Sequence, residues 1–190
     1  ARKRELSLVD VTCSGATTHN ILEQGQFFAP AQISAVTADT ELVTVTIGGN
    51  DVSYMRNAIA LGHPAHPGLM RMIIPSAASE AEVETAFAGL QARLERVVTE
   101  VHARAPNARV VFVPYFTVLP PAGTCPRLAL DDASADRMRA VAQRLNAVTE
   151  AAAHESGAEF FDLATLSRDH HACSAAPWVM DANALDYAGA

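Results

Sequence analysis

Short apolar stretches alternate with longer helical patterns along this chain. Four stretches predict strands, at residues 6–12, 42–47, 109–114 and 158–163, and those at 42–47 and 109–114 are apolar enough to be buried. Two longer segments repeat apolar residues at steps of three and four, which is typical of helices that bury one face. The first begins at Ser79 and ends at 105–107, and the second runs over 134–155.

The ends of the long helices carry their own signals. Ser79 and Glu82 have the spacing of a capping box, and Gly157 is a suitable stop for the second helix. The stripes expected to be buried are Val83, Phe87, Leu90, Leu94, Val97 and Val101 in the first helix, and Met138, Val141, Leu145, Val148 and Ala152 in the second. Short helices are expected near 18–22 and 30–36. Residues 56–78 are rich in Gly and Pro, and we expect an irregular insertion with one helical turn.

This alternation of strands and helices predicts an α/β fold. A mostly parallel sheet with helices on both faces and right-handed crossovers follows from the order of the elements. Ligands of such sheets bind beyond the carboxyl ends of the strands. We therefore expect function in the loops at 13–18, 48–54, 114–127 and 162–179 of a single domain spanning residues 1–190.

The loop after the second predicted strand is the most informative stretch. The strand LVTVTI leads directly into Gly48, Gly49, Asn50 and Asp51. Two interpretations remain open from spacing alone. The four residues form either a plain turn followed by a helix cap, or a sharp turn that presents Asn50 to a ligand.

Composition narrows the classes of function. Hydrophobic residues make up 49% of the 190 residues and charged residues 18%, which indicates a globular chain. The net charge of -7, with a single basic cluster at 2–4, does not favour nucleic-acid binding. No apolar run approaches the ~20 residues of a membrane span, and residue 1 is not followed by a signal peptide. His63 and His66 are separated by a proline loop without a nearby carboxylate or Cys, so we expect no metal site there.

The odd number of cysteines, three, suggests that part of the protein is missing from this chain. Cys125 and Cys173 each lie in a loop that follows a predicted strand, which would suit a disulfide, although the sequence does not fix the pairing. Cys13 is then a buried free thiol or lacks its partner. The chain also begins with Ala rather than Met. We therefore expect that sequence preceding residue 1 has been removed or left out.

Two loops resemble conserved blocks of a known family. Gly48-Gly49-Asn50-Asp51 after a buried strand resembles the third block of the SGNH (GDSL-type) esterases and lipases. The segment CSGATT at 13–18 resembles their second block, in the form found in secreted actinobacterial members. Cys125, Cys173 and the Pro-Trp-Val at 177–179 are similar to that branch, so the resemblance spans essentially the whole chain. It implies a secreted protein with a three-layer α/β/α, flavodoxin-like fold.

The resemblance implies hydrolysis of carboxylic esters without metal or cofactor. A Ser attacks the ester, a His removes its proton, and an acyl-enzyme forms. Gly15, through its backbone N–H, and Asn50, through its side-chain amide, match the family's oxyanion donors. Ser14, Asp51 and Trp178 are expected around the substrate, with Asp51 capping a helix or bracing the turn rather than acting in the chemistry. The implied partner is a small ester or lipid, bound by a monomer.

The chain departs from the family pattern at both ends. It contains no Gly-Asp-Ser, which should lie on a strand before residue 1, and no Asp-x-x-His, which should follow 187–190. We expect a chain truncated at both ends that carries only the oxyanion half of the site. The missing strand would leave a gap between the strands that end at Cys13 and Ile47, so the chain should fold poorly or close its sheet differently.

Other interpretations use the residues that are present. Ser14 lacks a His placed to activate it, and His170 or His171 with Asp162 or Asp169 is more simply a solvated pair.

A non-catalytic descendant that binds an acyl or sugar ligand is the main alternative to an esterase. A nucleotide-binding domain is disfavoured because no Gly-rich phosphate loop is present.

Overall fold

A three-stranded parallel sheet forms the centre of the fold. The computed structural model describes residues 7–62 and 76–179. Its strands are β1 (Leu42–Val45), β2 (Arg109–Phe112) and β3 (Glu159–Phe160), in the order β1-β2-β3. Val45 pairs with Phe112, and Phe112 pairs with Phe160. The predicted α/β class and parallel sheet are confirmed.

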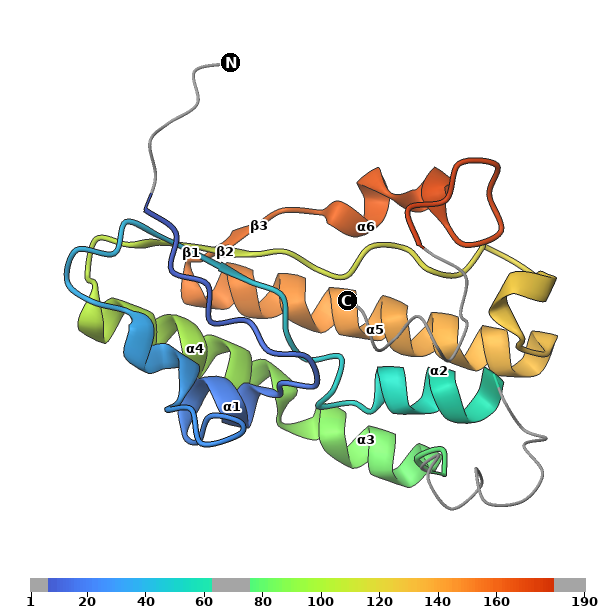
Figure 1. Cartoon of the computed structure of the whole chain (residues 1–190), viewed down its shortest axis with the longest axis horizontal. Helices are drawn as coiled ribbons and strands as arrows, with labels where there is room; N and C mark the ends of the chain where they lie inside the picture. Colours follow the sequence, from blue (N-terminus) through green and yellow to red (C-terminus); the bar gives the residue numbers. More distant parts are fainter. Residues whose placement is uncertain (1–6, 63–75, 180–190) are drawn as a thin grey trace.

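Helices pack against this sheet and extend beyond its carboxyl edge. The α-helices are α1 (Thr18–Leu22), α2 (Tyr54–Gly62), α3 (Glu80–Ala88), α4 (Leu90–Arg104), α5 (Asp132–Ser156) and α6 (Leu163–Leu166). The 3-10 helices are η1 (Gln32–Ala35), η3 (Pro126–Leu128) and η4 (Arg168–His170). In Figure 1, α4 and α5 lie side by side along one face of the strands, and the short α6 lies on the opposite side.

The first long helix is two helices. The capping box is present, because the Ser79 hydroxyl accepts from the Glu82 amide and the Glu82 carboxylate accepts from the Ser79 amide, at 3.2 and 2.7 Å. The predicted single helix breaks at Gly89, whose φ of -120° and ψ of 6° are not helical. The six stripe residues are nevertheless all buried, because the stripe continues across the break from α3 into α4.

Helix α5 follows the predicted pattern closely. It begins slightly before the predicted start because the Asp131 carboxylate caps it, accepting from the amide of Ser134 at 2.7 Å. Gly157 ends it in the left-handed conformation, with φ of 72°. Met138, Leu145 and Ala152 are buried on its inner face, as predicted.

The described start of the predicted insertion, up to residue 62, is more regular than predicted. Helix α2 occupies nine residues, where a single turn was expected. The buried side chain of Asn57 accepts from the Ala78 amide at 2.7 Å, which anchors α2 to the segment before α3. His63 and His66 lie outside the described residues.

The strand predicted at 6–12 is not formed by residues 7–12. A strand depends on a neighbour for its hydrogen bonds, and within the described residues β1 pairs only with β2. No described strand therefore lies beside 7–12, and Leu8 and Val9 are 85% and 67% exposed. The sheet does not close between this segment and β1.

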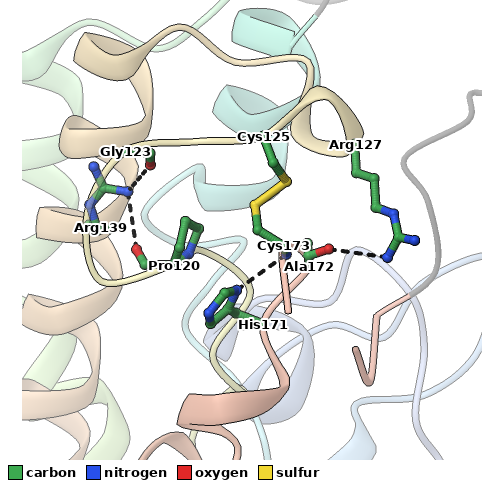
Figure 2. The surroundings of a disulfide bond; sticks show 8 residues. All are labelled: Pro120, Gly123, Cys125, Arg127, Arg139, His171, Ala172 and Cys173. Carbon is green, nitrogen blue, oxygen red and sulfur yellow. Dashed lines mark hydrogen bonds between the residues drawn. A yellow bond between two sulfur atoms is a disulfide. The ribbon is translucent and has the colours of Figure 1, made fainter. Parts of the chain in front are cut away.

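A disulfide joins the loops that follow β2 and β3. Cys125 and Cys173 have their Cα atoms 5.8 Å apart and are bonded, which confirms the pairing suggested by their loops. Figure 2 shows Arg127 donating to the carbonyl oxygen of Ala172 beside this bond. The amide of Ala172 also donates to the carbonyl oxygen of Val118, at 2.9 Å. Cys13 is a free thiol.

Candidate functional site

The turn after β1 places Asn50 at the carboxyl edge of the sheet. Gly48 has φ of 102°, a backbone conformation that residues with a side chain rarely adopt. A Cβ at Gly48 would also lie 3.0 Å from Cδ1 of Leu145 on α5. The sharp turn thus depends on glycine. The amide of Val52 closes it by donating to the Gly48 carbonyl oxygen at 3.1 Å.

The Asn50 side chain reaches the second predicted loop. Its Nδ2 donates to the carbonyl oxygen of Ala16, at 3.0 Å. A side-chain amide has two N–H donors, and this bond uses one of them. The described residues offer no acceptor for the other. Asn50 is therefore held in one orientation with one donor left for a ligand.

Gly15 lies next to the residue that Asn50 binds. Its φ is 80°, and the Ala16 amide donates to the Cys13 carbonyl oxygen at 3.1 Å to close the turn. Within the described part of the chain, no acceptor binds the Gly15 N–H. The two residues predicted to be oxyanion donors are thus brought together through Ala16.

The Asp51 carboxylate lies against Thr18, the first residue of α1. It accepts from the Thr18 amide at 3.0 Å and from the Thr18 hydroxyl at 2.5 Å. Its side chain is only 6% exposed, and Nε of Arg93 lies 3.7 Å from one of its oxygens. Asp51 therefore fastens the turn after β1 to the start of α1. Its contact with substrate stays a prediction.

Tyr115 supports the turn from the other side. Its phenolic oxygen accepts from the Gly49 amide at 3.3 Å. A Cβ on Gly49 would lie 2.9 Å from Cζ of Tyr115, so the ring packs directly on the glycine. Burial raises the pKa of Tyr115, and the nearby Asp51 carboxylate raises it further, although the bond from Gly49 acts in the opposite direction. The phenol therefore remains neutral at physiological pH.

A mostly apolar cavity of ≈ 330 Å³, whose lining also includes Arg139, Asn146 and Arg168, lies beside Tyr115. Tyr115 and Tyr54 form part of its wall. The loop after β2 and helix α5 supply most of the rest, including Phe116, Val118, Leu119, Ala142 and Leu145. Burial raises the pKa of Tyr54 to about 12. The cavity suits the apolar part of a small molecule.

Trp178 and the two histidines form a separate loop after α6. The rings of His170 and Trp178 stack with centroids 4.2 Å apart, and Trp178 is 55% exposed. Nδ1 of His170 lies 2.7 Å from the carbonyl oxygen of Ala176. Nδ1 of His171 accepts from the Cys173 amide at 3.2 Å. In the described ranges, no hydrogen bond joins this loop to Gly15 or Asn50.

The internal substitutes for a nucleophile and base are not assembled. Ser14 is exposed, and its carbonyl oxygen accepts from Nε2 of Gln26 at 3.2 Å. Asp162 caps α6 by accepting from the Thr165 amide at 2.9 Å, so its carboxylate orients neither histidine. The described residues contain no group of three or more His, Cys, Asp or Glu that could hold a metal. Nor do they contain a helix long and apolar enough to cross a membrane.

Sequence reasoning missed two residues of this site. Tyr115 follows the third predicted strand and belongs to no recognisable sequence motif. Arg93 lies in the first long helix, and its Nε donates to the Thr18 hydroxyl, 75 positions away, at 3.0 Å. Neither contact leaves a local signal, because each depends on how distant elements pack.

Comparison with known proteins identifies related chains. Residues 1–185 match the GDSL-like lipase/acylhydrolase family. A lipase of Streptomyces rimosus is 31% identical over 167 residues, which cover 88% of this chain and 57% of that lipase. Lipase 2 of Streptomyces coelicolor is 32% identical over 179 residues, with coverage of 88% and 59%. The chain thus spans less than two thirds of the length of these lipases.

Two crystal structures share the fold. An extracellular lipase from Streptomyces rimosus has a TM-score of 0.66 and 30% identity, and the match covers 90% of this chain and 68% of that one. Phospholipase A1 from Streptomyces albidoflavus has a TM-score of 0.68 and 29% identity, with coverage of 89% and 66%. These likenesses extend over nearly the whole chain.

Proposed function

Because the chain belongs to the GDSL-like lipase/acylhydrolase family, we propose that it supplies the oxyanion-binding half of a serine ester hydrolase. The observation that carries the proposal is the hydrogen bond from Asn50 Nδ2 to the Ala16 carbonyl oxygen. It places a free side-chain N–H beside the Gly15 turn. The family's pattern assigns oxyanion donation to these two positions.

The proposed chemistry is acyl transfer through a covalent intermediate. A serine Oγ attacks the ester carbonyl carbon while a histidine accepts the serine proton. The carbonyl oxygen becomes negative and accepts hydrogen bonds from the Gly15 N–H and the Asn50 side chain. Collapse expels the alcohol, which takes the proton from the histidine, and water then releases the acid by the same steps. A neutral amide donor of this kind is worth ~3 kcal/mol of the barrier.

The serine and the histidine are proposed to come from sequence outside these 190 residues. The family carries them in a Gly-Asp-Ser block and an Asp-x-x-His block, neither of which occurs here. The 190 residues would then form part of one SGNH domain. In that protein, Ser14 and Trp178 would border the substrate, and Asp51 would hold the turn.

A small carboxylic ester or lipid is the proposed substrate. The apolar cavity beside Tyr54 and Tyr115 supports this class, because an acyl chain or an apolar alcohol needs such a surface. We propose a secreted monomer. The Cys125–Cys173 disulfide and the extracellular relative from Streptomyces rimosus support secretion.

A fluorophosphonate probe, which labels activated serines, tests the proposal. The probe is applied to the 190-residue chain and to the protein expressed from the reading frame extended on both sides, called here the extended protein. We expect no labelled serine in the chain and one labelled serine, outside these residues, in the extended protein. Labelling of Ser14 in the chain would overturn the proposed division of the site.

The same experiment separates the enzyme from a binding protein. An extended protein that contains neither block, resists labelling and hydrolyses no p-nitrophenyl ester would be a non-catalytic acyl- or sugar-binding descendant. The family resemblance supports this second candidate as well as the first, and absence of both blocks from the extended reading frame would favour it. Binding of decanoate or a simple sugar, followed by NMR, would then identify its ligand class.

A further inference from the structure

A hydrogen-bonded chain of three side chains runs behind the proposed oxyanion donors. Nε of Arg93, on α4, donates to the Thr18 hydroxyl at 3.0 Å. The hydroxyl in turn donates to the Asp51 carboxylate at 2.5 Å. Since Thr18 receives its hydrogen bond from Arg93, its own proton is directed toward Asp51. The chain therefore has one direction, from Arg93 through Thr18 to Asp51.

This chain holds both partners of the bond between Asn50 and Ala16. Asp51 is the neighbour of Asn50, which donates that bond. Thr18 is the first residue of α1 and follows Ala16, which accepts it, by two positions. Thr18 is fully buried and the Asp51 side chain nearly so, so water does not replace their bond. Any shift of Thr18 relative to Asp51 therefore moves the donor of the Asn50 bond relative to its acceptor.

The end of α3 holds the Arg93 guanidinium in a defined position. Its Nη2 donates to the carbonyl oxygen of Ala86 at 3.1 Å. A Cβ at Gly89 would lie 2.8 Å from its Nη1. The break between α3 and α4 at Gly89 therefore leaves the space that the guanidinium occupies. Two of its nitrogens are fixed, one by the helix end and one by Thr18.

We propose that Arg93 is a positioning residue that sets the orientation of the Asn50 side-chain amide through Thr18 and Asp51. This inference rests on the proposed oxyanion role of Asn50. Among the described residues Arg93 makes no hydrogen bond to Gly15 or Asn50, so its effect on them passes through Thr18 and Asp51. A merely structural Arg93, which balances the charge of Asp51, would change stability but leave the Asn50 amide in place.

The side-chain NH₂ resonances of Asn50 in the ¹⁵N-labelled extended protein distinguish these roles. They are assigned by their loss in Asn50→Ala. Arg93→Met keeps the aliphatic stem and removes the guanidinium. Gly89→Ala leaves Arg93 unchanged and displaces its guanidinium. Arg96→Met, on the same helix, is the matched control because it removes an exposed ion pair with Glu23.

We expect the Asn50 NH₂ resonances to move in Arg93→Met and in Gly89→Ala, and to stay unchanged in Arg96→Met. Exchange of the Thr18 amide hydrogen should accelerate about tenfold in Arg93→Met, because its bond to Asp51 is loosened. Unchanged Asn50 resonances in a folded Arg93→Met variant would overturn the proposal.

A second pair of variants covers the case in which Arg93→Met does not fold. Thr18→Val removes the bridging hydroxyl with little change of shape, and Thr18→Ser keeps it. We expect the Asn50 resonances to move in Thr18→Val and to remain in Thr18→Ser. Equal resonances in the two would contradict the proposal. None of these readouts depends on ester hydrolysis, so failure of the proposed function would appear separately, in the probe experiment.

Discussion

The side-chain amide of Asn50 donates to the carbonyl oxygen of Ala16 across 3.0 Å, joining two loops that are 34 positions apart in the sequence. The first loop, at 13–18, contains Gly15, and the second, at 48–54, contains Asn50. These are the two residues predicted to bind an oxyanion. The bond fixes the amide plane without using all of its donors. An oxyanion hole needs donors that are already in place before charge develops, and the fixed Asn50 amide meets this requirement of its proposed role.

The contact between Gly49 and Tyr115 predicts a strong effect of a small substitution. Gly49→Ala places a Cβ 2.9 Å from Cζ of Tyr115, so the ring or the turn must move. We expect a loss of about 1–3 kcal/mol in the free energy of unfolding, measured with urea. In a Tyr115→Ala background the same substitution should cost much less. An equal cost in both backgrounds would show that contact with the Tyr115 ring does not cause the loss of stability.

The half-buried side chain of Tyr54 predicts a loss of stability at alkaline pH. Its pKa is raised from 10.0 to about 12 in the folded protein because burial disfavours the phenolate. The unfolded chain therefore ionises first, and the stabilisation present below pH 10 disappears as the pH rises toward 12.

Urea unfolding at several pH values between 9 and 12 measures this effect. The free energy of unfolding should fall with a slope of up to about 1.4 kcal/mol per pH unit from this one group. Tyr54→Phe should have a shallower slope over the same window. Identical slopes for the two proteins would mean that Tyr54 ionises normally when folded.

The Cys125–Cys173 disulfide predicts that removing the bond lowers the stability of the protein. The two residues are 48 positions apart, and closing such a loop restricts the unfolded chain. We expect the double substitution to Ser at Cys125 and Cys173 to lower the free energy of unfolding by about 2–4 kcal/mol. Cys13→Ser, at the free thiol, is the matched control and should cost less. A double variant as stable as the original would exclude a structural role for the bond.

The sequence was most informative where structure depends on local spacing. The stripe from Val83 to Val101 was predicted because helical periodicity is visible in any short window. The Ser79 capping box was predicted for the same reason, since its partner lies three residues away. The break at Gly89 was missed, because the apolar stripe continues through it and one glycine does not itself end a helix.

Features that need a distant partner were predicted poorly or not at all. Residues 7–12 have the composition of a strand, but no described strand lies beside them to complete the pairing. Gly15 and Asn50 were proposed from the family resemblance rather than from spacing. Arg93 gave no signal, since its bond to Thr18 exists only after α1 packs on α4.

The kinetics of Asn50→Ala in the extended protein test the central claim most directly. Asn107→Ala, in the exposed turn after α4, is the control, and both variants are assayed on one p-nitrophenyl ester. If Asn50 stabilises the oxyanion, kcat should fall by about 100-fold or more while KM changes little, because the bond forms mainly in the transition state. A kcat equal to that of Asn107→Ala would contradict the account and remove Asn50 from the oxyanion hole.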